Sequence, residues 1–127
     1  MTDIQAAIGR EQLKQFKDFR AKRDLIFSIY KSSGIDILDS DDDKYTPIRY
    51  RAVLKTNSQN KIIDQLKENG IGSIVPIEKD ELLDNPDNYV NAMNLSESTI
   101  SLPIYPSLDM RDANKIHDIV AQLEDGV

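Results

Sequence analysis

Residues 2–31, TDIQAAIGREQLKQFKDFRAKRDLIFSIYK, contain no proline and carry one uninterrupted helical pattern. Thr2 and Gln5 have the spacing of a capping box, in which each side chain accepts a hydrogen bond from the other residue's backbone N–H. Apolar side chains recur at helical spacing from Ile4 to Tyr30. The sequence therefore predicts a helix about 28 residues long, which would measure about 42 Å. A chain of 127 residues needs less than this to cover its own core. We therefore expect part of the helix to pack against something else.

The rest of the chain predicts a mixture of short strands and helices. Strands are expected where apolar residues alternate or where an apolar run ends at a proline: residues 46–55, 71–77 and 99–105. Helices are expected over residues 57–69, around 89–93 and over 110–123. Gly70 is expected to end the first of these helices in a left-handed conformation. The order of elements predicts an α+β fold, with a long N-terminal helix followed by a small, mostly antiparallel sheet covered by helices.

Composition excludes several classes of protein. The chain has 16 basic and 22 acidic side chains and a net charge of −6, which argues against a nucleic-acid partner, because such binding needs a basic face. No apolar run is long enough to cross a membrane. The N-terminus lacks the basic and apolar regions of a secretory signal. The absence of cysteine removes disulfides and thiolate chemistry. We expect a soluble, cytoplasmic domain.

The residues give no support to a metal site. Asp39, Asp41 and Asp43 have the spacing of a calcium-binding loop. Such a loop also needs a glycine and a glutamate where this chain has Lys44 and Tyr50. A solvated acidic turn is the better interpretation.

Catalytic groups are equally hard to find. His117 is the single histidine, and it lies at the edge of the apolar stripe of the last helix, which favours a boundary residue. The glycines form no phosphate-binding loop. Tyr50 and Arg51 could present a phenol and a guanidinium to an anionic ligand, although Tyr50 could equally be an aromatic residue at the edge of the core. Composition and spacing by themselves indicate an α+β domain and no more.

A longer pattern carries a resemblance. Residues 1–9, MTDIQAAIG, followed by Gln12-Leu13, resemble the opening of a long helix in the DegT/DnrJ/StrS family of PLP-dependent sugar aminotransferases. Three later segments resemble that family's strand and helix landmarks in the same order: YRAVLK (50–55), IIDQLKENGI (62–71) and ISLPIYPSL (100–108).

The resemblance implies a part of a fold-type-I aminotransferase, an enzyme whose active site lies at a dimer interface. Residues 1–31 would form a linker and interface helix, and residues 32–127 the C-terminal small domain. In the family, the lysine that binds pyridoxal phosphate (PLP) lies upstream of the matching segment. The resemblance therefore implies no catalytic residue and no cofactor site in this chain, with PLP belonging to the parent enzyme. Tyr50 and Arg51 are the best candidates for a wall over the substrate.

Two functions remain open at this point. The chain could be the C-terminal part of an aminotransferase acting on keto-sugar nucleotides, without catalytic activity of its own. Alternatively, it could be a free-standing binding or dimerisation module, or the small subunit of a split enzyme. The expected partner is a second copy bound through the first helix, or a PLP-binding N-terminal domain.

Overall fold

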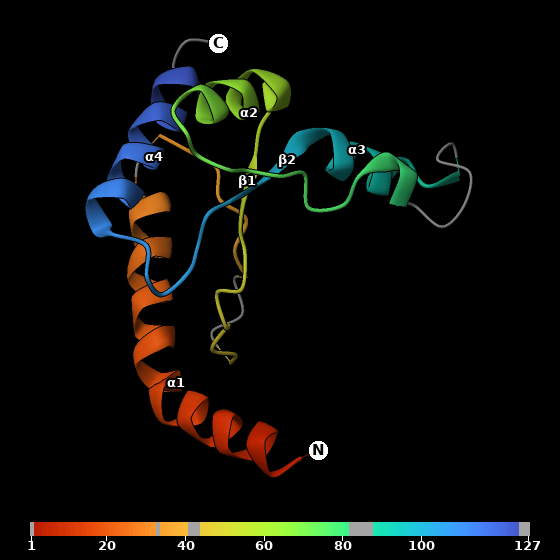
Figure 1. Ribbon diagram of the computed structural model, residues 1–127. Helices are drawn as coiled ribbons and strands as arrows, with labels where there is room; N and C mark the ends of the chain where they lie inside the picture. Colours follow the sequence, from red (N-terminus) through yellow and green to blue (C-terminus); the bar gives the residue numbers. More distant parts are fainter. Residues whose placement is uncertain (1, 33, 41–43, 82–87, 125–127) are drawn as a thin grey trace.

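The computed structural model describes residues 2–32, 34–40, 44–81 and 88–124. Their elements follow one another along the chain as α1 (Asp3–Tyr30), β1 (Ala52–Lys55), α2 (Gln59–Glu68), a short 3-10 turn η1 (Lys79–Glu81), α3 (Val90–Ser98), β2 (Thr99–Leu102) and α4 (Met110–Glu124). Figure 1 shows α4 and α2 beside the two strands, and a long α1 that leaves the rest of the molecule. This arrangement confirms the expected α+β fold with a small antiparallel sheet and covering helices.

The first helix begins as the sequence predicts. The Thr2 backbone N–H donates to Gln5 Oε1 at 2.9 Å, and the Gln5 N–H donates to Thr2 Oγ1 at 3.3 Å, so the capping box is confirmed. The two ends of α1 differ in environment. Tyr30 and its neighbours in the last turns are buried, whereas Ile4 and Leu13 are each 73% exposed. The N-terminal half of α1, which lies away from the other elements in Figure 1, therefore presents apolar side chains to solvent.

The two strands pair antiparallel, from Ala52 opposite Leu102 to Lys55 opposite Thr99. The prediction of a strand over 46–55 was wrong for residues 46–51, and that of a strand over 99–105 was wrong for residues 103–105. The register explains both errors, because the next residue on the second strand is Pro103, which has no N–H for the ladder.

Two further predictions need correction. Residues 71–77 do not form a strand; they contribute a single bridge, between Ile74 and Ser101. Nearby Pro76 lacks the N–H that a longer ladder would use. The helix expected around residues 89–93 extends over Val90–Ser98, so its second half was missed. At its end the hydroxyls of Ser98 and Thr99 donate to carbonyl groups four residues earlier. A polar sequence gives no apolar periodicity from which such a turn could be predicted.

A single hydrophobic core joins the helices to the sheet. The helix α4 contributes Ala113, Ile116 and Val120, and it contacts both α1 and α2. Leu54 of β1 and Ile100 of β2 are completely buried beneath these helices. The side chains that form the core are Ile26, Phe27, Tyr30, Ile37, Ala52, Leu54, Ile62, Leu66, Ile100, Leu102, Ile104, Leu108, Ala113, Ile116 and Val120.

Glycine ends α2 as predicted. Gly70 has a φ of +74°, a left-handed conformation that side chains with a Cβ rarely adopt. Its N–H donates to the Lys67 carbonyl, and the Ile71 N–H donates to that of Leu66, so the turn closes the helix. Within the described residues, no helix has both the length and the apolar character that a membrane span requires.

Tyr30 provides a test of this fold. Its side chain is completely buried, and its hydroxyl donates to the Pro103 carbonyl at 2.8 Å. The substitution Tyr30→Phe leaves the partly buried Pro103 carbonyl without its partner, so we expect the free energy of unfolding to fall by about 1–2 kcal/mol. Urea denaturation followed by circular dichroism measures this change. Tyr45→Phe is the matched control, because Tyr45 is 71% exposed. Equal effects of the two substitutions would contradict the role assigned to the Tyr30 hydroxyl.

Candidate functional site

An ion-pair cluster organises the segment that precedes β1. The Arg49 guanidinium forms a two-point contact with the Asp39 carboxylate, and Lys31 Nζ approaches the same carboxylate at 2.6 Å. Asp39 is brought here because residues 36–38 run along β1, where the Leu38 N–H donates to the Val53 carbonyl at 2.8 Å. A two-point contact fixes the orientation of a guanidinium as well as its position.

The same arginine is held from a second direction. The Arg49 guanidinium carbon lies 3.8 Å from the centroid of the Phe27 ring, which is the geometry of a cation–π contact. Phe27 belongs to the buried last turns of α1. The segment around Arg49 is therefore attached to the core through an aromatic ring and to the preceding loop through a carboxylate.

Electrostatics agree with this geometry. The pKa of Asp39 is lowered to about 2, chiefly because Arg49 donates hydrogen bonds to the carboxylate. Burial acts in the opposite direction, while Lys31 and the Ser40 backbone N–H add to the lowering. Since the folded-state pKa lies below the ordinary value, the ionised pair stabilises the fold above about pH 4. That contribution is lost as the pH falls from about 4 towards 2.

Tyr50 and Arg51 follow Arg49 directly and remain accessible. Tyr50 is 71% exposed, and the Arg51 guanidinium carbon lies 5.8 Å from the centroid of its ring. They lie outside regular secondary structure just before β1, rather than within the strand that the sequence predicted. Both line one groove of about 440 Å³, together with Phe27, Leu38, Asp39, Ser40, Pro47, Ile48 and Arg49. The structure thus brings the two predicted site residues together on one side of the groove. We call this side, formed by Tyr50 and Arg51, the wall, and the contacts of Arg49 support it.

Arg49 and Asp39 were not singled out for this role from the sequence. Asp39 was considered only as part of an acidic turn, and Arg49 stood unremarked beside two more conspicuous residues. The one available signal was the pair of arginines that flank Tyr50, Arg49 and Arg51, since either of them could have been the group that binds an anion. The partners of Arg49 are ten residues away in the sequence or on α1, so local spacing could not reveal them.

An apolar hollow adjoins this groove. It has a volume of about 250 Å³ and is lined by Leu38, Val53, Pro76, Ile77, Ala92, Leu95, Ser96 and Thr99. Leu38 lines both cavities, so the charged wall and the apolar hollow are neighbours. A ligand lying across Leu38 would meet a guanidinium on one side and aliphatic side chains on the other.

The remaining sequence candidates lie elsewhere. Asp41 and Asp43 fall outside the described residues. His117 is half-buried on α4, with its Nε2 3.1 Å from the Ser32 hydroxyl oxygen and its Nδ1 3.3 Å from a carboxylate oxygen of Asp118. Among the described residues, no three histidine or carboxylate side chains lie together as metal ligands would.

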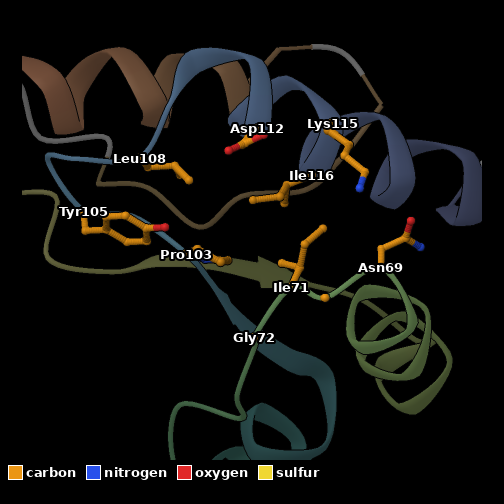
Figure 2. A pocket seen from close by; sticks show the side chains of 10 residues that line it. Asn69, Ile71, Gly72, Pro103, Tyr105, Leu108, Asp112, Lys115 and Ile116 are labelled. Carbon is orange, nitrogen blue, oxygen red and sulfur yellow. The ribbon is translucent and has the colours of Figure 1, made fainter.

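A separate cavity lies between the end of α2 and the start of α4 (Figure 2). It has a volume of about 460 Å³ and shares no lining residue with the groove at Tyr50. Its lining residues are Asn69, Gly70, Ile71, Gly72, Pro103, Tyr105, Leu108, Asp112, Lys115 and Ile116.

Comparison with known proteins identifies the chain's relatives. The family model for the DegT/DnrJ/EryC1/StrS aminotransferases matches residues 1–121. The chain belongs to this family. It is also similar to the spore coat polysaccharide biosynthesis protein SpsC of Bacillus subtilis, with 28% identity over 99% of the chain and 37% of SpsC.

Solved structures of the DegT family have the same fold as this chain. The putative sugar aminotransferase Spr1654 from Streptococcus pneumoniae, in its apo form, gives a TM-score of 0.87 at 23% identity, covering 99% of this chain and 36% of Spr1654. DesV of S. venezuelae, solved in complex with a ketimine intermediate, gives a TM-score of 0.84 at 20% identity, covering 97% of this chain and 36% of DesV. The chain therefore spans about a third of the length of the relatives it matches.

The residues of this chain do not fit a covalent PLP site. A lysine that binds PLP needs a desolvated amine with a lowered pKa. All ten lysines lie in the described part of the chain, and each is exposed. No lysine here has the environment in which an amine would be primed to bind the cofactor.

The Asp39–Arg49 pair can be tested by titration. Carbon-detected NMR of the side-chain carboxyl should give Asp39 a pKa of about 2. In Arg49→Gln we expect that pKa to rise towards the ordinary value of about 4, because the main donor of hydrogen bonds is lost. Arg111→Gln, an exposed change on α4, is the control and should leave Asp39 unchanged. A wild-type pKa near 4 would show that the pair does not form in solution.

Proposed function

We propose that this chain is the C-terminal, substrate-facing part of a PLP-dependent aminotransferase that acts on keto-sugar nucleotides. The observation that carries the proposal is the accessible Tyr50–Arg51 pair on a wall anchored through Arg49, in a chain of this family. Residues 32–127 form the small domain in this proposal, and residues 1–31 form the helix that connects it to a cofactor-binding part. The alternative functions, a dimerisation module or the small subunit of a split enzyme, differ from it in the polypeptide that α1 contacts.

The wall has the chemistry that a sugar nucleotide requires. A guanidinium matches the geometry of phosphate oxygens and stays charged at every physiological pH. The Arg51 guanidinium is exposed, whereas Arg49 is already committed to Asp39, so Arg51 is the group that can pair with a diphosphate. Tyr50 offers a flat face for stacking on a sugar or base, and a hydroxyl that can donate or accept.

Tyr50 and Arg51 are also held in position before a ligand binds. Since Arg49 is fixed between Phe27 and Asp39, the two residues that follow it start from an anchored backbone. Less conformational freedom is then lost when a ligand binds, which improves affinity without adding a contact. Arg49 and Asp39 act in this proposal by positioning Tyr50 and Arg51, not by touching the substrate.

The chemistry of amino transfer must come from outside this chain. Because every lysine is exposed, we assign the PLP lysine to the cofactor-binding part of the enzyme, in agreement with the length of the relatives. The isolated chain should then lack transferase activity. Borohydride reduction after addition of PLP should fix the cofactor to no single lysine; stoichiometric fixation to one lysine would contradict this assignment.

The function can be tested in a hybrid enzyme. Fusing this chain to the cofactor-binding part of a relative such as Spr1654 should restore PLP binding and amino transfer to a keto-sugar nucleotide. In that hybrid, Arg51→Gln and Tyr50→Phe should each raise KM for the sugar nucleotide, by roughly ten-fold for the arginine, while the cofactor absorbance stays the same. The arginine effect is larger because a charge-assisted contact is lost.

Lys61→Gln is the control for the hybrid, because Lys61 is exposed on α2 and lines neither the groove nor the hollow. An unchanged KM in both site variants would overturn the role of the wall. If a hybrid fails to fold, NMR of the chain itself with a UDP-sugar gives the same answer, since the amides of Tyr50 and Arg51 should shift first.

A second candidate function rests on the exposed half of α1. The described residues leave four large apolar side chains in this half open to solvent, those of Ile4, Ile8, Leu13 and Phe16. Exposed apolar side chains of this size favour an interaction with another polypeptide, either a second copy of this chain or a separate cofactor-binding subunit. The chain would then act as a dimerisation module, or as the small subunit of a split enzyme.

Sedimentation tests the role of α1. We expect the purified chain to form dimers or larger assemblies, because roughly half of a long helix is unpaired. Ile8→Asp combined with Leu13→Glu should shift the chain to monomers, since both replace an exposed apolar side chain by a charged one. Lys17→Glu, a charge change of the same kind at an exposed polar position, is the matched control. A wild-type chain that stays monomeric at high concentration would exclude self-association through α1.

A further inference from the structure

The cavity between α2 and α4 has features that the proposed function does not use. Figure 2 shows α4 along one side, with Ile71 and the chain after α2 facing it across the opening. Pro103 and Tyr105 close one end, and Asn69 lies at the other. A cavity of about 460 Å³ is at the small end of the range for ligand pockets, so it suits a small molecule rather than a peptide or a nucleotide.

Two opposite charges line the same side of this cavity. Asp112 and Lys115 are three residues apart on α4, a spacing that places both on one face of the helix and normally favours an ion pair. Within the part of the chain that the structure describes, neither side chain forms an ion pair, with the other or with any third group. Figure 2 shows the two side chains diverging, Asp112 towards Leu108 and Lys115 towards Asn69.

The surface between the two charges is apolar. Ile116 follows Lys115 on α4, and in Figure 2 its side chain appears between those of Asp112 and Lys115, with Ile71 facing it from the other side of the cavity. Leu108 and Ile116 are almost completely buried, at 7% and 2% exposed, so they form a fixed floor rather than a mobile rim. The cavity therefore offers an acidic end, an aliphatic centre and a basic end.

The basic end has a second hydrogen-bonding group. Asn69 donates one amide hydrogen to the Gln65 carbonyl at 2.9 Å, which fixes the orientation of its side chain. The other hydrogen of that amide group has no recorded acceptor among the described residues. An anionic group beside Lys115 could accept from it, while the Asp112 carboxylate at the far end would repel a second anion.

We propose that this cavity binds a small zwitterionic amino acid with an aliphatic side chain. The ligand's ammonium group pairs with Asp112, its carboxylate with Lys115 and the Asn69 amide, and its side chain covers Ile71 and Ile116. A ligand with only one charge leaves the opposite group of the cavity uncompensated. A ligand with an acidic side chain places a carboxylate against the aliphatic floor, which is costly without a partner. The site is separate from the Tyr50 groove and would bind in the chain as it stands.

The test is an NMR titration of the full 127-residue chain, labelled with ¹⁵N, with three probes. L-leucine carries both charges, N-acetyl-leucine lacks the ammonium, and leucinamide lacks the carboxylate. Leucine should shift the amides of Gly70, Gly72 and Leu108 with a dissociation constant on the order of 1 mM, because both charged contacts are exposed. Each analogue should bind roughly three- to five-fold more weakly, as the loss of one exposed ion pair predicts.

Two variants separate the contacts. In Asp112→Asn, leucine should bind no better than N-acetyl-leucine, because the group that recognises the ammonium is gone. In Lys115→Gln, leucine should bind no better than leucinamide. Both positions are exposed, so neither substitution should change the fold. Lys61→Gln, which removes a positive charge outside the cavity, is the matched control and should leave all three affinities as in the wild type.

Three results would overturn the proposal. The first is the absence of any amide shift with leucine up to about 20 mM, more than ten-fold above the expected dissociation constant. The second is equal affinity for the three probes in the wild-type chain, which would show that the charges do not select the ligand. The third is a set of shifts centred on Tyr50 and Arg51, which would place the amino acid in the other groove.

Discussion

The last turns of α1 hold the rest of the molecule in place. Tyr30 is completely buried and its hydroxyl donates to the carbonyl of Pro103, the residue at which the β1–β2 ladder ends. Three residues earlier, Phe27 provides the ring on which the Arg49 guanidinium rests. One buried helical turn therefore supports both regions that we consider for binding. Pro103 lines the cavity between α2 and α4, and Arg49 anchors the wall that carries Tyr50 and Arg51.

The two binding regions use charge differently. At the wall, Asp39 accepts from Arg49 and Lys31, and its pKa is lowered to about 2, so the carboxylate serves to hold the backbone. In the second cavity, Asp112 and Lys115 have the spacing of a pair and do not form one. Paired charges are structural in the first region, and the separated charges of the second are available to a ligand. An acidic chain with a net charge of −6 can still present positive groups where local geometry places them.

The exposed half of α1 bears on how this chain would fit into a longer enzyme. A helix whose first half has apolar side chains at 73% exposure has not buried the surface that would stabilise it. The family relatives are about three times as long as this chain, and we propose that the missing contacts belong to the cofactor-binding part or to another copy. The same division explains why a member of an aminotransferase family has ten lysines and none in an apolar environment.

Local patterns determined the elements whose signals are complete within a few residues. The capping box at Thr2 and Gln5, the length of α1, the left-handed Gly70 and the apolar stripe of α4 all depend on neighbours three or four residues away. These features could be predicted because the hydrogen bonds and side-chain contacts that cause them are local. The family resemblance was equally readable, since it is carried by continuous strings of sequence.

Only the tertiary structure decided where the strands end and which charges meet. The ladder stops at Ala52 because the residue opposite the next position is Pro103, about fifty positions away in the sequence. Arg49 meets Asp39 because residues 36–38 run beside β1, and it meets Phe27 because the last turns of α1 pack into the same core. By itself the sequence determined α1, α2 and α4, the capping box, the left-handed Gly70 and the family. Pairing across long separations decided the limits of the sheet and the shape of both cavities, because those contacts exist only once the core has brought distant segments together.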